Sequence, residues 1–131
     1  YLDCGPGGAA TSTGCATAAT YEEACFKGLL ECIERDAVAL WWHGGMRRPS
    51  LPLDLIDPAQ PRLFWWLQRR ARRTGLIDIT QDNGVPAVAA YSAGSGGGGI
   101  AVGSAAALRV EDAALAAVTE MIQIEASWLG S

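Results

Sequence analysis

Apolar side chains recur every three to four residues between positions 26 and 40, which is the spacing that lines one face of an α-helix. Thr20 and Glu23 precede this stripe as a capping box, in which a hydroxyl and a carboxylate satisfy free backbone N–H groups. The stripe consists of Phe26, Leu29, Leu30, Ile33, Ala37 and Leu40. Gly44 and Gly45 follow it and are typical of a helix C-terminus. The pattern predicts a long helix from Thr20 to the two glycines, after a loop with a weak strand over Thr11–Ala16.

Shorter elements follow this helix, separated by prolines and glycines. A second helix is predicted over about Pro61–Arg73, and a last, long helix over Val110–Leu129. Three strands are predicted between these two helices, over Leu76–Thr80, Val85–Tyr91 and Ile100–Ala105. We therefore predict an α+β fold, in which a small and mostly antiparallel sheet packs against two long helices.

Length and composition restrict the classes of protein that fit this sequence. The 131 residues favour a single domain, and a hydrophobic content of 50% excludes a disordered chain. A net charge of −4 and a pI near 4.8 argue against a dedicated nucleic-acid-binding protein. No apolar run reaches the roughly 18 residues of a membrane span. The four cysteines lack the C-x-x-C spacing and the histidine pair of a zinc site, so we expect reduced, partly buried thiols in a cytoplasmic protein.

Charged residues form a ridge beside the apolar stripe of the first long helix. The ridge consists of Glu23, Lys27, Glu31 and Glu34. Glu31 and Glu34 are three residues apart, so their carboxylates repel each other unless a positive group or water lies between them. One interpretation is a solvated face, on which Lys27 and Arg35 pair weakly with Glu31. The other is a binding site for Mg²⁺, which proteins hold with one or two carboxylates together with phosphate oxygens.

The last predicted helix carries a second polar pair, Glu120 and Gln123, beside its apolar face. Glu125 lies in line with that apolar face, where a charge needs a partner, so we expect it to pair with an arginine of the second helix. The arginines within Arg69–Arg73 can contact an acidic partner or nucleic acid, but a solvated helix face is the favoured interpretation. His43, at the end of the first long helix, is assigned a structural role.

Four stretches that occur in the same order resemble the motifs of the YcaO family and span nearly the whole chain. The most specific is Glu-Cys-Ile-Glu-Arg-Asp-Ala at residues 31–37, after Glu23-Ala24, which matches the Glu-x-x-Glu-Arg-Asp-Ala run of the family's long helix. The other stretches are Thr11-Ser12-Thr13-Gly14-Cys15-Ala16, Asp78-Ile79-Thr80-Gln81-Asp82 with Val85-Pro86, and Glu120-Met121-Ile122-Gln123. The resemblance places the metal-site interpretation of Glu31 and Glu34 above the solvated-face interpretation.

The resemblance implies an enzyme that uses ATP and Mg²⁺ to activate backbone amides of a peptide in the bacterial cytoplasm. In the best-known branch, a Cys, Ser or Thr side chain of a ribosomally made precursor peptide attacks the preceding amide carbonyl. ATP then phosphorylates the resulting oxygen, and phosphate leaves to give a thiazoline or an oxazoline. The transferring phosphoryl group needs its charge spread over metal ions and donors. The implied partners are the precursor peptide and a leader-peptide-binding or ubiquitin-activating-like protein, while nucleic acid and membranes are not expected.

The same resemblance implies a site on the polar ridges of two helices that face each other across a nucleotide cleft. The implied Mg²⁺ ligands are Glu31, Glu34 and Glu120. Gln123 would orient ATP or a ligand water, and Arg35 would lie near phosphate or hold the carboxylates. Ser12 and Lys27 are further candidates for nucleotide contacts. No residue is assigned as the catalytic group.

The chain departs from the family pattern in three respects. It has Ser12-Thr13-Gly14 where many members have Ser-Asn-Gly, it is much shorter than a complete member, and its helix-to-strand link near Gly75-Leu76 is a few residues short. We therefore expect residues 1–131 to form one domain that is incomplete at both ends. Two alternative functions fit the sequence: a non-catalytic scaffold that binds a peptide or partner protein, and a relative that forms thioamides or assists methylthiolation. The motifs do not distinguish azoline, thioamide and amidine products, nor do they specify the substrate peptide or the oligomeric state.

Overall fold

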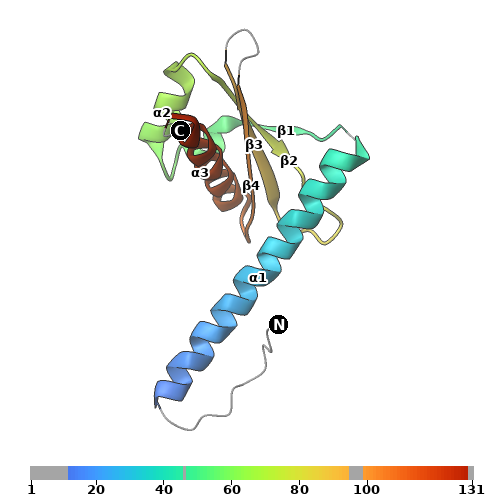
Figure 1. Ribbon diagram of the computed structural model, residues 1–131, viewed down its shortest axis with the longest axis vertical. Helices are drawn as coiled ribbons and strands as arrows, with labels where there is room; N and C mark the ends of the chain where they lie inside the picture. Colours follow the sequence, from blue (N-terminus) through green and yellow to red (C-terminus); the bar gives the residue numbers. More distant parts are fainter. Residues whose placement is uncertain (1–11, 46, 95–98, 130–131) are drawn as a thin grey trace.

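A four-stranded antiparallel sheet lies between two long helices in the computed structural model, which describes residues 12–45, 47–94 and 99–129 (Figure 1). The helices are α1 (Ser12–Gly44), α2 (Pro61–Arg69) and α3 (Val110–Leu129), and a 3₁₀ helix, η1, spans Leu53–Ile56. The strands are β1 (Ser50–Leu51), β2 (Arg73–Asp78), β3 (Ala87–Ala93) and β4 (Ile100–Ala106), which are neighbours in this order. The predicted α+β class and the antiparallel sheet are confirmed.

Helix α1 begins earlier than the sequence pattern predicts. Residues 12–16 are helical, so the strand predicted over Thr11–Ala16 is wrong for the part that the structure describes. Thr20 is therefore an interior residue of α1 and not its N-cap. Three of the residues 16–19 are alanine, the best helix former, which favours this extension of the helix. The predicted end is confirmed, because α1 stops at Gly44 and Gly45 has a φ of 62°, which glycine adopts without strain.

The boundary between α2 and β2 also lies earlier than predicted. Helix α2 ends at Arg69, and β2 already begins at Arg73, the residue where the helix was expected to end. The backbone becomes extended at Arg70, with φ −75° and ψ 163°. Its side chain then reaches Glu125 on α3 through a hydrogen bond of 2.6 Å. A tertiary ion pair thus accompanies the early end of a helix whose local pattern would continue.

A close contact in the centre of the sheet requires glycine in β2. Gly75 pairs with Tyr91 on β3, and a Cβ atom at Gly75 would lie 2.4 Å from the tyrosine side chain. The ring occupies the space that a side chain at position 75 would need. The link near Gly75-Leu76, which looked short against the family pattern, lies inside this regular strand.

Different helices cover the two faces of the sheet. On one face, Ala37 of α1 packs with Ala87 and Ala89 of β3. On the other face, α3, α2 and η1 pack against Val88 and Ala90. Successive residues of a strand point to opposite faces, so the whole stretch from residue 87 to 90 is buried. The long helices therefore lie on opposite sides of the sheet, which corrects the expectation that their polar ridges face each other directly.

The N-terminal half of α1 extends away from the sheet in Figure 1. Of the predicted apolar stripe, Ala37 is buried against the sheet. Phe26, Leu29 and Leu40 are instead exposed. The stripe thus marks a true helix, of which the part near residue 37 contacts the sheet.

The cysteines only partly behave as the spacing predicts. Cys25 takes part in a disulfide, so the expectation of a reduced thiol is wrong for Cys25. Cys32 is a free thiol as expected, but it is exposed and not partly buried. Cys25 and Cys32 lie about two helical turns apart on α1, too far from each other for a bridge, and the absence of zinc-site spacing does not exclude a bridge from Cys25 to another residue. The side chains of Cys4 and Cys15 lie outside the described residues. Within the described ranges, no helix combines the length and the apolar character needed to span a membrane.

Candidate functional site

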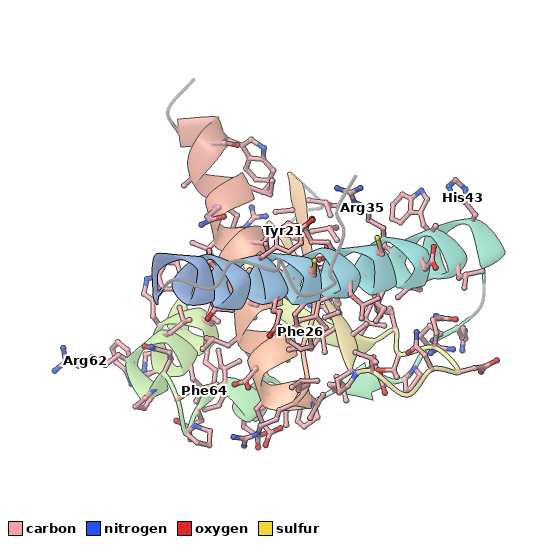
Figure 2. The ribbon with its side chains drawn as sticks, turned by 90° about the horizontal axis from the view of Figure 1, so that it is seen from below. Tyr21, Phe26, Arg35, His43, Arg62 and Phe64 are labelled. Atoms are coloured by element: carbon pink, nitrogen blue, oxygen red, sulfur yellow. The ribbon has the colours of Figure 1, made fainter. Side chains whose placement is uncertain are left out.

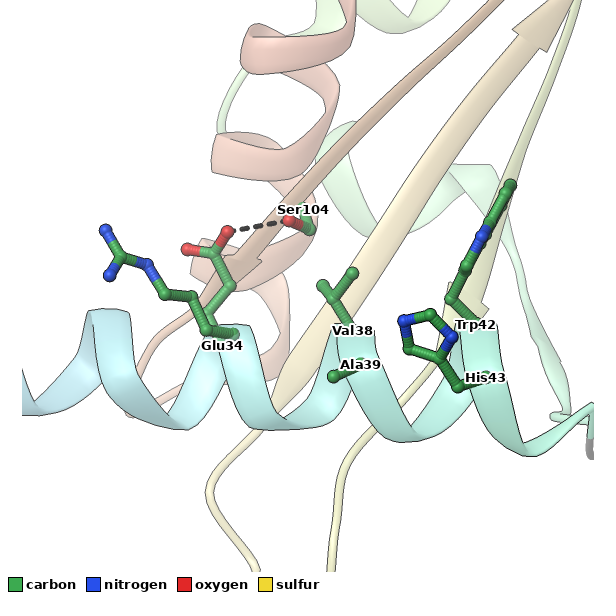
Figure 3. Close-up of a pocket in the computed structure, with 7 residues that line it drawn as sticks. Glu34, Val38, Ala39, Trp42, His43 and Ser104 are labelled. Carbon is green, nitrogen blue, oxygen red and sulfur yellow. Dashed lines mark hydrogen bonds between the residues drawn. The ribbon is translucent and has the colours of Figure 1, made fainter.

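Glu34 on α1 and Ser104 on β4 connect the helix to the sheet at the candidate site (Figure 3). The Ser104 hydroxyl donates a hydrogen bond of 2.6 Å to Oε2 of Glu34. Ser104 faces α1 because side chains alternate along a strand, and the neighbouring Ala105 packs in the core under α3. The strand register therefore sets this contact between residues that are 70 positions apart.

Glu120 on α3 reaches the same serine from the other side of the sheet. Its Oε1 accepts a hydrogen bond of 3.3 Å from the backbone N–H of Ser104, on the edge strand β4. The helix can come this close because residue 103 is a glycine. A Cβ atom at Gly103 would lie 2.3 Å from the carbonyl oxygen of Ala117 and 3.0 Å from Cβ of Glu120. The β4 edge thus brings carboxylates from α1 and α3 to one serine.

The Glu34 carboxyl has a raised pKa. Its burial is the largest cause, and the negative charges of Glu120 and Glu31 raise the pKa further. The hydrogen bond from Ser104 and the positive charge of Arg35 lower the pKa but do not outweigh these effects. A cation bound near Glu34 would relieve the unfavourable charge, and oxygen-rich sites of this kind suit Mg²⁺.

Two pockets flank the Glu34 side chain. The first, of about 310 Å³, is lined by Glu34, Arg35, Val38, Ala39, Trp42, His43 and Ser104 (Figure 3). The second, of about 210 Å³, is lined by Lys27, Leu30, Glu31, Glu34, Ala105 and Ala106. Glu34 lines both pockets. It therefore lies between Arg35, with the aromatic rings of Trp42 and His43, on one side and Lys27 and Glu31 on the other.

Most of the residues predicted for the site lie around Glu34. Lys27 and Glu31 share a pocket with it, and Arg35 lines the other pocket. Gln123 is exposed on α3 and lines neither pocket. The side chain of Ser12, the first residue of α1, lies outside the described residues.

Glu31, Glu34 and Glu120 do not form a complete set of metal ligands in this structure. In the described part of the chain, no three acidic, histidine or cysteine side chains are arranged as a group that could hold a metal ion. The assignment of Glu31, Glu34 and Glu120 as Mg²⁺ ligands therefore stays a prediction.

Sequence reasoning missed several residues of this region. Ser104 carried no signal, because a single serine in a short strand has no motif and its role depends on the register of β4. Gly103 had no signal for the same reason. Trp42 and His43 line the first pocket, although His43 had been assigned a purely structural role. Only the family motif on α1 pointed to their neighbourhood.

The structure confirms the predicted partner of Glu125. Arg70, directly after α2, binds both carboxylate oxygens of Glu125 at 2.6 and 2.9 Å, and Ser92 donates a further hydrogen bond to it. Burial alone would raise the pKa of Glu125. The hydrogen bonds from Arg70 and Ser92, with the charges of Arg70 and Arg72, hold the pKa below its ordinary value. This cluster ties the C-terminal part of α3 to the sheet.

Comparison with known proteins identifies the family. The family described as YcaO cyclodehydratase, ATP- and Mg²⁺-binding, matches residues 3–129. The chain therefore belongs to the YcaO family, as its motifs predicted, and ATP and Mg²⁺ are the ligands of that family. No curated protein sequence gives a significant match.

Three of the solved structures that resemble the chain are heterocyclases or a microcin synthetase complex. One is a heterocyclase in complex with substrate and cofactor, with 36% identity over 72% of this chain and a TM-score of 0.64. The heterocyclase TruD has 35% identity over 80% of this chain and a TM-score of 0.71. The E. coli microcin synthetase McbBCD complex with pro-MccB17 bound has 18% identity over 80% of this chain and a TM-score of 0.64, and this likeness is one of fold alone. The chain spans 13%, 16% and 27% of the three matched chains, respectively.

Proposed function

We propose that Glu34 and the polar side chains around it contribute the Mg²⁺- and ATP-binding centre of a YcaO-type heterocyclase. The proposal depends on one observation: Glu34 and Glu120, from helices on opposite faces of the sheet, both bond to Ser104 at the β4 edge. In this proposal Glu34 and Glu120 are metal ligands, and Glu31, one helical turn before Glu34, joins them. Ser104 keeps the two carboxylates oriented before the cation binds.

The chemistry of the surrounding side chains fits Mg²⁺ and ATP. Carboxylate oxygens are ligands that Mg²⁺ prefers, and the pKa of Glu34 is raised by its burial and, to a lesser extent, by the negative charges of Glu120 and Glu31. Lys27 and Arg35, which line the two pockets beside Glu34, supply positive charge for phosphate groups. When bound, Mg²⁺ would spread the charge of the phosphoryl group that ATP transfers.

The proposed substrate is a backbone amide of a ribosomally made precursor peptide. A Cys, Ser or Thr side chain of that peptide loses its proton and attacks the preceding carbonyl carbon. The γ-phosphoryl group of ATP passes to the former carbonyl oxygen, which then leaves as phosphate while the amide nitrogen loses its proton. The peptide loses one water in total and gains an azoline ring. Two similar proteins are described as heterocyclases, one of them in complex with substrate and cofactor, which supports this class of substrate.

The remaining expectations belong to the same proposal. We propose a cytoplasmic enzyme that acts with a leader-peptide-binding or ubiquitin-activating-like partner protein. Thioamide formation and a non-catalytic scaffold are the competing functions. A scaffold would not need the paired carboxylates at the β4 edge, so the convergence of Glu34 and Glu120 favours the enzyme.

Calorimetric titration of the intact protein with ATP and Mg²⁺ tests the proposal. We expect binding by the wild type, loss of Mg²⁺-dependent binding in Glu34→Gln, and unchanged binding in Glu22→Gln, an exposed position on the same helix that lies outside the charged ridge. Full binding by Glu34→Gln would refute the site. If the wild type gives neither heat nor a thermal shift, the scaffold is the correct function. Mass spectrometry of a Cys-containing precursor peptide would then separate azoline formation, which removes water, from thioamide formation.

A further inference from the structure

Half of the positive charge of the chain is concentrated in one short segment around α2. Residues 58–77 contain five arginines and no acidic residue, whereas the rest of the chain holds the other five basic residues and all 14 acidic ones. A protein with a net charge of −4 thus carries a strongly positive region on an otherwise acidic surface. The five arginines are Arg62, Arg69, Arg70, Arg72 and Arg73. Arg62 extends outward from α2 in Figure 2.

Three tryptophans are paired with these arginines. The guanidinium carbon of Arg69 lies 4.7 Å from the ring centroid of Trp65, and that of Arg70 lies 4.7 Å from the ring of Trp66. A third pair joins the segment to the C-terminal end of α3, where Arg72 lies 5.3 Å from the ring of Trp128. The three tryptophan side chains remain 57%, 45% and 42% exposed, respectively. We call Trp65, Trp66, Trp128 and the arginines of residues 62–73 the arginine–tryptophan surface.

Only part of this charge is used within the fold. Arg70 and Arg72 pair with Glu125, as described above. Arg69 and Arg73 are exposed and form no ion pair within the described ranges. Beside them lies a pocket of about 440 Å³, whose lining includes Gln68, Arg73 and Thr74. The surface therefore offers charged, aromatic and hydrogen-bonding groups together.

We infer that the arginine–tryptophan surface binds an acidic peptide segment with apolar side chains between its carboxylates. Guanidinium groups bind carboxylates with two parallel hydrogen bonds, and exposed tryptophans cover the intervening apolar side chains. Nucleic acid fits less well, because a polyphosphate chain longer than the patch would extend over the flanking acidic surface, whereas a short peptide segment places its carboxylates at the arginines alone. The inference does not depend on the metal site, so its failure would leave the proposed function untouched.

Fluorescence anisotropy of the intact protein tests this binding. The probe is a short fluorescein-labelled peptide in which Glu alternates with Leu, and its counterpart carries Lys in place of Glu. We expect the Glu peptide to bind, with an affinity that falls as salt is added, and the Lys peptide not to bind. Reversing two exposed charges with Arg69→Glu and Arg73→Glu should weaken binding about tenfold or more. Arg47→Glu with Arg109→Glu makes the same change in net charge elsewhere and should leave the affinity within about twofold.

The variants must be folded for this comparison, which thermal unfolding checks. Arg62→Glu provides a second variant that removes no arginine–tryptophan pair, and it should weaken binding by a smaller factor. Absence of binding by the Glu peptide would overturn the inference, as would binding that the Arg69 and Arg73 changes leave intact. A single-stranded oligonucleotide or vesicles of anionic lipid that bind more tightly through the same arginines would also overturn it, in favour of a phosphate-bearing partner.

Discussion

Replacing Glu34 by Gln should stabilise the ligand-free protein at neutral pH, although it removes the proposed metal ligand. Gln keeps an oxygen that accepts the hydrogen bond from Ser104, and it has almost the same volume. It loses the negative charge that burial, Glu31 and Glu120 disfavour. The substitution therefore separates the cost of the charge from the shape of the side chain.

The expected gain follows from the neighbouring charges. A like-charge pair at helical spacing costs about 0.2–0.5 kcal/mol, and Glu34 has one such neighbour in Glu31 and a second carboxylate in Glu120. Partial burial adds to this cost, while the weaker hydrogen bond from Ser104 to a neutral acceptor offsets part of it. We expect a net gain of about 0.5–1 kcal/mol, or a rise in Tm of about 2–5 °C for a domain of this size.

The pH dependence gives the sign of the effect. The pKa of Glu34 is higher in the fold than in the unfolded chain, so protonation of this group favours folding. That contribution is fully present below the ordinary glutamate pKa of about 4.3 and is lost as the pH rises through the raised value in the fold. The difference between Glu34→Gln and the wild type should therefore be small at low pH and grow towards neutrality.

Urea unfolding over this pH range measures the difference, with Glu23→Gln as the control for loss of one exposed charge on α1. A gain at neutral pH that persists undiminished in acid would refute the charge-based reasoning. So would a destabilised Glu34→Gln protein, because the hydrogen bond to Ser104 would then outweigh the repulsion.

Further variants test the approach of α3 to the sheet, the Arg70–Glu125 ion pair and the hydrogen bond from Ser104. Gly103→Ala should lower the free energy of unfolding by about 1–3 kcal/mol in urea titrations, because the added Cβ would lie 2.3 Å from the backbone of α3. Gly28→Ala should instead raise the free energy of unfolding by about 0.5–1 kcal/mol, because no atom lies within 4 Å of the added Cβ. Equal effects of the two changes would contradict the close approach of α3. Arg70→Met should cost about 2–3 kcal/mol by leaving the Glu125 carboxylate without its main partner, and adding Glu125→Leu should restore most of the loss. The pKa of Glu125 is lowered in the fold, so the Glu125 carboxylate stabilises the protein at pH values above the ordinary glutamate pKa. This stabilisation should disappear in the same urea titrations as the pH falls through the lowered pKa of Glu125. Ser104→Ala should weaken Mg²⁺-ATP binding about tenfold in calorimetry, and an unchanged affinity would exclude the Ser104 hydroxyl from orienting Glu34.

Elements with a long and regular pattern could be predicted from the sequence alone. The bounds of α3 agree with the prediction, Val110–Leu129, because its apolar periodicity covers the whole helix. β4 begins at the predicted residue, Ile100. The pairing of Glu125 with an arginine could also be predicted, because a charge on an apolar helix face needs a partner whatever the arrangement of the other elements.

Boundaries that depend on tertiary contacts could not be predicted in the same way. Helix α2 ends before Arg70 although the local pattern continues, and Arg70 then reaches the distant Glu125. The carboxylates of Glu34 and Glu120 were assigned to one site from family motifs. Their common bond to Ser104 could not be predicted, because it requires the register of β4 and the packing of a helix on each face.

Consecutive residues of β4 serve different helices, and this alternation makes the site sensitive to strand register. Gly103 provides the close approach of α3, and the next residue, Ser104, directs its hydroxyl to α1. A shift of one residue along β4 would reverse the faces of both side chains. The serine would then point towards α3, and Gly103 or Ala105, depending on the direction of the shift, would face Glu34 in its place. Hence the geometry of the proposed metal site depends on the pairing of β4 with β3 as directly as on the carboxylates themselves.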